Sequence, residues 1–168
     1  MASYEKGKYT VCEWVKEHFP KGSTALDVGA CDGDWQQRLG DWLVMDAVEI
    51  FEPYLERYQL RDKYRDVYVC DMADFEYEHY DLIIFGDVIE HMDVDKARKV
   101  LEYAKTRCKD MVVSVPYEYF QEPYNGNKWE AHIQDDLTDE LFNSRYPGFE
   151  HLVWFWDYCY YHKAKEAL

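Results

Sequence analysis

Glycine and proline are scarce in this sequence of 168 residues, and closely spaced cysteine pairs are absent from it. The 5 cysteines are widely spaced and include no Cys-x-x-Cys pair, which excludes a regular disulfide framework and disfavours a structural zinc site. The 8 glycines and 5 prolines are scattered, so neither a low-complexity tract nor an interdomain linker is indicated. We expect a single domain over residues 1–168 in a reducing compartment.

Basic residues and long apolar runs are also few. The 19 Lys and Arg residues stand against 34 Asp and Glu residues, giving a net charge of −15. Such a charge repels phosphate backbones and anionic lipids, so a nucleic-acid partner is disfavoured and membrane binding is not expected. No run approaches the roughly 18 apolar residues of a membrane span, and the first residues lack the apolar segment of a signal peptide. We expect a soluble, cytoplasmic protein.

Apolar residues make up 48% of the chain and aromatic residues 18%, which is enough for a sizeable core. Helical or strand-like periodicity recurs along the sequence, and helices alternate with short apolar strands. This alternation predicts a doubly wound α/β sheet of seven strands, mostly parallel, with an antiparallel terminal strand. Helices are predicted at 9–19, 34–39, 53–58, 93–107 and 137–142, and strands at 24–28, 42–50, 67–70, 82–85, 111–115 and as a pair within 149–162.

Polar and glycine residues follow the ends of the first four predicted strands. In sheets of this type, ligands bind outside the carboxyl ends of the strands. The loop 27–33 contains Gly29 and Gly33, which permit a tight turn whose amides face a ligand. Glu49 ends the second strand about 20 residues downstream, a spacing suited to holding the two hydroxyls of a ribose. Two further strand ends carry Asp71-Met72 and Asp87.

Five segments of the chain resemble the class I S-adenosylmethionine-dependent methyltransferases, from about residue 10 to residue 161. The match at 80–92 is the most specific, because a Glu-His pair follows the fourth strand as in many small-molecule members. The matching segments are LDVGACDG (26–33), VEIFEP (48–53), VCDMADF (69–75), YDLIIFGDVIEHM (80–92) and MVVSVPY (111–117).

This resemblance implies a Rossmann-like fold, S-adenosylmethionine as cofactor, and methyl transfer to a small or exposed acceptor. It places the methionine part of the cofactor at the loop 27–33, the ribose at Glu49 and the adenine at Asp71 and Met72. The residues implied in cofactor binding are Asp27, Gly29, Ala30, Cys31, Gly33, Glu49, Ile50, Asp71, Met72 and Asp87. One departure concerns Cys31, because the family often has a second glycine there, and a side chain narrows the approach to the cofactor.

A nicotinamide dinucleotide is a competing cofactor, since it binds to the same architecture. Its Gly-x-Gly-x-x-Gly fingerprint is not present, because Cys31 and Asp34 stand where glycines are required. The carboxylates of Asp32 and Asp34 would also repel a pyrophosphate, whereas a sulfonium cofactor is positively charged. The sequence therefore favours the methyl donor.

Two histidines near the predicted crevice are candidates for the general base, His91 after the fourth strand and His132 after the fifth. An alternative is a Mg²⁺ or Mn²⁺ site for O-methylation, with a ribose hydroxyl of RNA as one possible acceptor. It would use Asp87, Glu90 and His91 on one helix face, completed by His132. The loop 116–136 is expected to cover the acceptor. A third hypothesis is a non-catalytic, cofactor-binding partner subunit.

Overall fold

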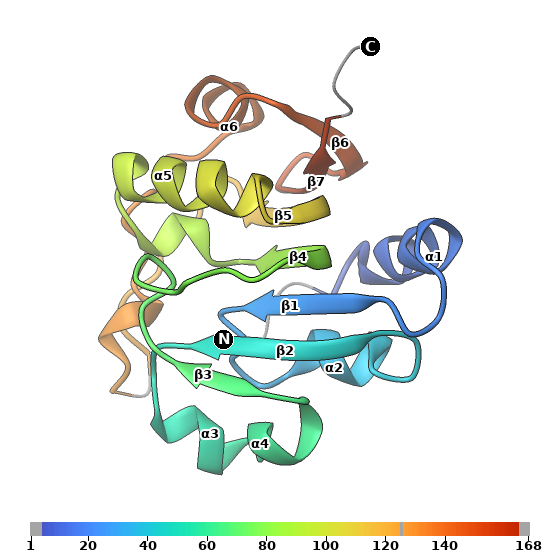
Figure 1. The fold of residues 1–168 in the computed structure, drawn as a ribbon. Coiled ribbons are helices and arrows are strands. Elements are labelled where there is room, and N and C mark those ends of the chain that lie inside the picture. Colours follow the sequence, from blue (N-terminus) through green and yellow to red (C-terminus); the bar gives the residue numbers. More distant parts are fainter. Residues whose placement is uncertain (1–4, 125, 165–168) are drawn as a thin grey trace.

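The computed structural model describes residues 5–124 and 126–164. Figure 1 shows a central sheet with helices on both of its faces. In chain order the elements are α1 (Lys8–His18), β1 (Thr24–Val28), α2 (Asp34–Leu39), β2 (Val44–Glu49), α3 (Pro53–Arg57), α4 (Leu60–Lys63), β3 (Val67–Val69), β4 (Tyr80–Gly86), the 3-10 turn η1 (Ile89–His91), α5 (Val94–Lys105), β5 (Cys108–Pro116), the 3-10 turn η2 (Lys128–Glu130), α6 (Asp139–Arg145), β6 (Phe149–Trp154) and β7 (Tyr158–Lys163).

The seven strands form one sheet in the order β3-β2-β1-β4-β5-β7-β6. The first five strands pair in parallel, and β7 pairs antiparallel with both β5 and β6. This confirms the predicted mostly parallel sheet with an antiparallel terminal strand. The carboxyl ends of the parallel strands lie along one edge, on the same side as the orange segment that follows β5 (Figure 1).

Alternate residues of the central strands enter two separate cores. On β4, Ile83 and Phe85 pack with the residues of α5 and α6, whereas Leu82 and Ile84 pack with those of α1 and α2. All four side chains are completely buried. Both faces of the sheet are therefore covered, which explains why this strand reads as an unbroken apolar run.

The helix α5 illustrates how local sequence sets element boundaries. Asp93 is its N-cap, and the Asp93 carboxylate accepts a hydrogen bond of 2.9 Å from the amide of Lys96. Ala97, Leu101 and Ala104 are buried on its inner face, as the periodicity predicts. The helix predicted at 137–142 begins later, at Asp139, because Thr138 caps it by accepting from the amide of Leu141.

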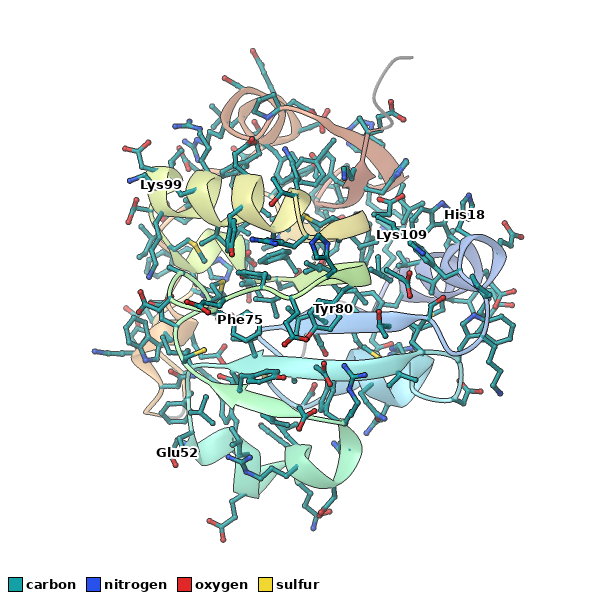
Figure 2. The ribbon with its side chains drawn as sticks, in the orientation of Figure 1. His18, Glu52, Phe75, Tyr80, Lys99 and Lys109 are labelled. Carbon is teal, nitrogen blue, oxygen red and sulfur yellow. The ribbon has the colours of Figure 1, made fainter. Side chains whose placement is uncertain are left out.

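The opposite end of the sheet, where the parallel strands begin, carries side chains with structural contacts. His18 and Lys109 lie on the side opposite the orange segment, near the amino ends of the strands (Figure 2). His18 bonds the carbonyl of Trp14 through Nδ1 at 2.8 Å, and Lys109 pairs with Asp81 at 2.6 Å. Along residues 5–124 and 126–164, the helices are all too short or too polar to cross a bilayer.

Candidate functional site

A cavity of about 630 Å³ opens outside the carboxyl ends of the parallel strands. Its walls come from the turn after β1, the end of β2, the segment after β4 and the segment 116–136. Ten residues predicted for the site line it: Gly29, Ala30, Cys31, Glu49, Ile50, Asp71, Met72, Asp87, His91 and His132.

The turn after β1 requires glycine at one position. Gly29 has φ +74°, and a Cβ added there would lie 2.5 Å from Cγ2 of Val88. Cys31 also adopts a left-handed conformation, with φ +47°, which glycine accepts more readily than a residue with a side chain. The position where the resemblance expects a second glycine therefore keeps a glycine-like backbone although it carries a thiol.

Glu49 is held at the end of β2 by the turn itself. Its carboxylate accepts hydrogen bonds from the amide of Cys31 at 2.9 Å and from the amide of Phe51 at 2.8 Å. Burial raises the pKa of Glu49, although these amide donors oppose the shift. Each carboxylate oxygen keeps a second lone pair, so adjacent hydroxyl groups can bind here as donors.

Asp71 and Met72 follow β3 on the cavity wall. The Asp71 carboxylate accepts a bond of 2.9 Å from the amide of Ala73 and pairs with Lys96 at 2.6 Å. Burial acts to raise the pKa of Asp71, but Lys96 and the Ala73 amide outweigh it and leave the pKa lowered. Asp71 is thus ionised and already paired, and Met72 offers an apolar surface beside it.

Asp27 and Gly33 lie behind the cavity wall. Asp27 is buried under the turn, where its carboxylate accepts a hydrogen bond of 2.5 Å from the hydroxyl of Tyr64. Burial raises the pKa of Asp27 to about 7. Gly33 is the N-cap of α2, with φ +78°. Both residues shape the turn in this structure and do not themselves face the cavity.

The segment after β4 differs from the helix assumed for the metal-site hypothesis. Asp87 has φ +56°, and only a 3-10 turn at Ile89–His91 follows it. The Asp87 carboxylate accepts hydrogen bonds from the hydroxyls of Ser114, at 3.1 Å, and Tyr158. The shared helix face with Asp87 does not form, and the group that could hold a cation consists of Glu90, His91 and His132.

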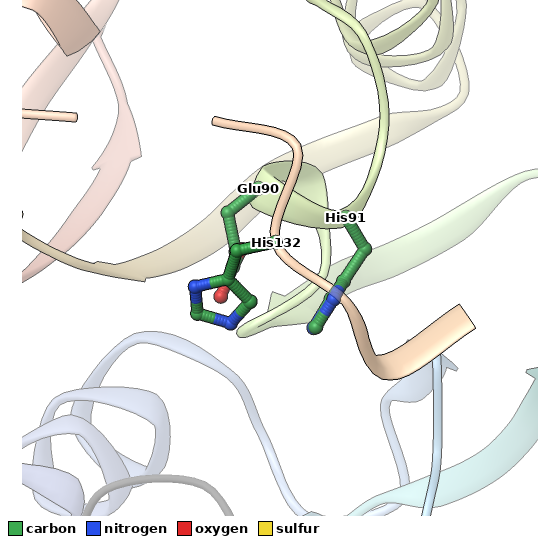
Figure 3. Close-up of side chains that lie close together, drawn as sticks. All are labelled: Glu90, His91 and His132. Atoms are coloured by element: carbon green, nitrogen blue, oxygen red, sulfur yellow. The ribbon is translucent and has the colours of Figure 1, made fainter. Parts of the chain in front are cut away.

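The two candidate bases lie together on this wall. Their rings are 4.7 Å apart between centroids and nearly perpendicular, at 77° (Figure 3). Nδ1 of His91 bonds the carbonyl of Ala131 at 3.1 Å, and Nδ1 of His132 bonds the carbonyl of Tyr119 at 2.7 Å. A carbonyl only accepts, so in each ring Nδ1 carries the hydrogen and Nε2 keeps a lone pair in the neutral form.

Burial lowers the pKa of both imidazoles, and the neighbouring His91 lowers that of His132 further. Glu90 beside them is completely buried, and among the residues that the structure describes neither of its carboxylate oxygens has a hydrogen-bond partner. Burial, and then the nearby Asp87, raise the pKa of Glu90 well above its usual range. Two imidazole nitrogens and a carboxyl group that favours its protonated form therefore meet here.

Sequence patterns did not identify Trp35 as a wall residue. Its indole is 4% exposed, and Nε1 has no hydrogen-bond partner within the described part of the chain. The atom lies against Gly86, where an added Cβ would be 2.3 Å away. Trp35 is an apolar side chain in the first turn of α2, directly after Asp34, which indicates that it faces inward. Nothing in the sequence shows that its N–H is unpaired.

No protein-family model and no curated protein matches this chain by sequence. Solved structures do match its fold. An S-adenosylmethionine-dependent methyltransferase from Clostridium acetobutylicum ATCC 824 superposes with a TM-score of 0.71 and 12% identity, covering 97% of this chain and 92% of that one. A TehB-like SAM-dependent methyltransferase from Corynebacterium glutamicum ATCC 13032 gives 0.68 and 13% identity, covering 94% and 88%.

A third match is the 1,6-didemethyltoxoflavin-N1-methyltransferase of Burkholderia thailandensis, whose structure contains 1,6-didemethyltoxoflavin and S-adenosylhomocysteine. It has a TM-score of 0.65 and 18% identity, and the alignment covers 96% of this chain and 80% of that one. At these identities the likeness establishes a shared fold. The chain has the Rossmann-like fold of class I S-adenosylmethionine-dependent methyltransferases over nearly its whole length.

The cavity fits the cofactor of that fold. The left-handed turn at Gly29 lets a ligand approach the backbone, Glu49 accepts hydrogen bonds from hydroxyls, and Met72 offers an apolar wall. The Nε1 of Trp35 is unpaired among the described residues, but it is buried against Gly86 and does not itself face the cavity. The acceptors of Glu49 and the apolar wall at Met72 suit a ligand that carries hydroxyl groups and a planar ring.

Substituting Asp27 should change how stability depends on pH. Its pKa in the fold, about 7, lies above the usual 3.8, so its stabilising contribution is complete below about pH 4 and is lost as the pH rises through about 7. Asp27→Asn keeps an acceptor for Tyr64 but does not titrate. The free energy of unfolding of Asp27→Asn relative to wild type should therefore increase between pH 4 and pH 8, measured by urea denaturation.

The exposed Asp41→Asn is the matched control and should show a difference that does not change with pH. A constant difference for Asp27→Asn as well would contradict the raised pKa.

The histidine tautomers can be read directly by nitrogen-15 NMR. We expect His91 and His132 to be neutral at pH 7, with the hydrogen on Nδ1, and to titrate below the usual 6.5 because burial disfavours the charged ring. The variants His91→Gln and His132→Gln assign the signals. A hydrogen on Nε2 would show that the carbonyl contacts do not orient the rings as described, and a titration midpoint above 6.5 would show that burial does not set their pKa.

Proposed function

We propose that this protein is an S-adenosylmethionine-dependent methyltransferase that acts on a small-molecule acceptor. The observation that carries the proposal is the cavity at the carboxyl edge of the sheet, which brings Glu49 and the glycine turn to one side and the two histidines to the other. The solved structures that share the fold include methyltransferases described as N- and O-methyltransferases, which supports the class of reaction.

In this proposal the first wall holds the cofactor. Glu49 would accept hydrogen bonds from the ribose hydroxyls, Met72 would lie along the adenine, and the turn at 29–33 would surround the methionine part. When bound, S-adenosylmethionine supplies an electrophilic methyl group on a positively charged sulfur.

The second wall would position the acceptor and exclude water. Several hydrogen bonds tie the segment 116–136 to the body of the protein, among them those from the amides of Tyr117 to Asp157, Glu118 to Leu137 and Ile133 to Glu90, at 3.0, 2.8 and 2.8 Å. It places Tyr119 and Trp129 on the cavity wall. Because methyl transfer is an in-line displacement, such positioning contributes much of the catalysis.

The proton of an acceptor hydroxyl or ammonium would go to an imidazole. Nε2 of His91 and Nε2 of His132 both keep a lone pair in the tautomer described above, and both rings are neutral near pH 7 because burial lowers each pKa. A positioned base of this kind contributes roughly 10²- to 10⁴-fold to the rate. This is the role we assign to the pair.

A metal-assisted O-methyltransferase is the second candidate function. The observation that favours it is the group formed by Glu90, His91 and His132, in which a carboxylate oxygen and one nitrogen of each ring lie within 4.8 Å of one another. One oxygen and two imidazole nitrogens suit Mn²⁺ better than Mg²⁺. A cation held there would lower the pKa of an acceptor hydroxyl.

Cofactor binding tests the first proposal. We expect micromolar binding of S-adenosylhomocysteine to the wild type by isothermal titration calorimetry. Glu49→Ala should weaken it by about tenfold or more, because hydrogen bonds between hydroxyls and a buried carboxylate are lost. Glu17→Ala, an exposed position on α1, is the control and should bind as the wild type does.

Wild-type protein that binds neither S-adenosylmethionine nor S-adenosylhomocysteine would overturn the proposed function. Binding without turnover over a broad acceptor panel, followed by turnover when a second protein is added, would instead support the partner-subunit hypothesis.

Metal removal separates the two candidates. If the first is right, dialysis against EDTA leaves both cofactor affinity and turnover unchanged. The metal-assisted reaction predicts loss of turnover with EDTA, recovery with Mn²⁺, and calorimetric binding of Mn²⁺ that His132→Ala abolishes. Mn²⁺ binding gives a readout that does not depend on knowing the acceptor.

A further inference from the structure

The cavity wall has an unusual balance of charge. Among the described residues that line it are nine Asp and Glu side chains and one lysine, with no arginine. The lysine, Lys96, is already paired with Asp71. An anionic acceptor would meet this field without a cationic side chain to bind it, so phosphate and carboxylate groups are disfavoured on the acceptor side. The single net positive charge of S-adenosylmethionine offsets little of this excess of negative charge.

Glu90 is one of these acidic groups and lies in the part of the wall that would hold the acceptor. Glu90 is completely buried, and neither of its oxygens has a hydrogen-bond partner among residues 5–124 and 126–164. Buried polar groups are nearly always paired, and an ionised carboxylate in such a place needs a donor or a cation. The charged groups that face it are the carboxylates of Asp87 and Glu130, which cannot supply either.

The neighbours of Glu90 are acceptors as well. Because Nδ1 of His91 and of His132 each donates to a backbone carbonyl, Nε2 of both rings accepts. Figure 3 shows the Glu90 side chain beside His132, with His91 across from them. One nitrogen of each ring and one Glu90 oxygen lie within 4.8 Å of one another. A cationic group with several N–H donors would satisfy this cluster and keep Glu90 ionised.

An ammonium group meets that requirement. It carries three donors and a positive charge, and acceptors about 2.8 Å from its nitrogen at tetrahedral angles lie about 4.6 Å apart, which is inside the observed limit. The ring of Tyr119 lies 5.5 Å from that of His132 between centroids, and Trp129 and Trp156 are exposed side chains that line the same cavity. Aromatic faces attract cations and pack against planar bodies.

We propose that the acceptor is a small aromatic or apolar amine whose ammonium group binds between Glu90, His91 and His132. This inference rests on the proposed methyltransferase function and names its substrate class. The acidic wall would draw in the amine and reject carboxylates and phosphates. Glu90 would supply the counter-charge, and an imidazole Nε2 would take the proton that frees the nitrogen lone pair for methyl transfer.

The test compares three probes that differ only in the end group. The protein is first saturated with S-adenosylhomocysteine and then titrated calorimetrically with 2-phenylethylamine, 2-phenylethanol and 3-phenylpropionate. We expect the amine to bind about tenfold or more tightly than the alcohol, and the carboxylate to bind more weakly than either. In Glu90→Gln the amine should lose this advantage, whereas affinity for S-adenosylhomocysteine should stay unchanged.

Glu17→Gln removes the same charge on α1, far from the cavity, and should keep the wild-type preference. Equal affinities of wild type for amine and alcohol, a preference for the carboxylate, or binding of none of the three would overturn the amine proposal. So would an amine preference that survives in Glu90→Gln, or binding of Mn²⁺ in place of the amine. Failure of S-adenosylhomocysteine to bind the wild type is a separate result, which concerns the proposed function itself.

Discussion

The cavity exists because the connection that follows β1 and the connection that follows β4 cross opposite faces of the sheet. After β1 the chain returns through α2 on one face, whereas after β4 it returns through α5 on the other. These two parallel neighbours therefore turn away from each other at their carboxyl ends, and a crevice opens between the turns. Gly29 on one side and Asp87 on the other, both left-handed, mark the points where the chain departs.

Carboxylates that are buried or half-buried lie around and beneath this crevice, and each is stabilised differently. Glu49 is held by backbone amides and Asp27 by the hydroxyl of Tyr64. Asp71 is paired with Lys96. Glu90 alone among these four has no hydrogen-bond partner for its carboxylate within the described residues. Burying a carboxylate is costly unless a donor or cation accompanies it, so the protein's own groups stabilise three of these carboxylates, whereas Glu90 has a strongly raised pKa and would be ionised only beside a cationic ligand.

Much of the fold could be predicted because strand patterns are local. The apolar run 82–85 and the alternation of helices with strands follow from side-chain spacing alone. The residues at strand ends were equally accessible, since parallel strands bring their carboxyl ends to one edge. What failed was the helix assumed after β4. Ser114 and Tyr158, which are distant in sequence, hold the Asp87 carboxylate in the position that precludes it.

The sequence by itself determined the architecture and the list of residues at the carboxyl edge, because both depend on periodicity and on order along the chain. Only the tertiary structure decided which of them face the cavity. Asp27 turns toward Tyr64, the N–H of Trp35 is buried against Gly86, and Glu90 meets two imidazoles that backbone carbonyls orient. These contacts join groups up to about forty residues apart in the chain. A hydrogen bond over that separation produces no periodic pattern of residues, so a single sequence does not reveal it.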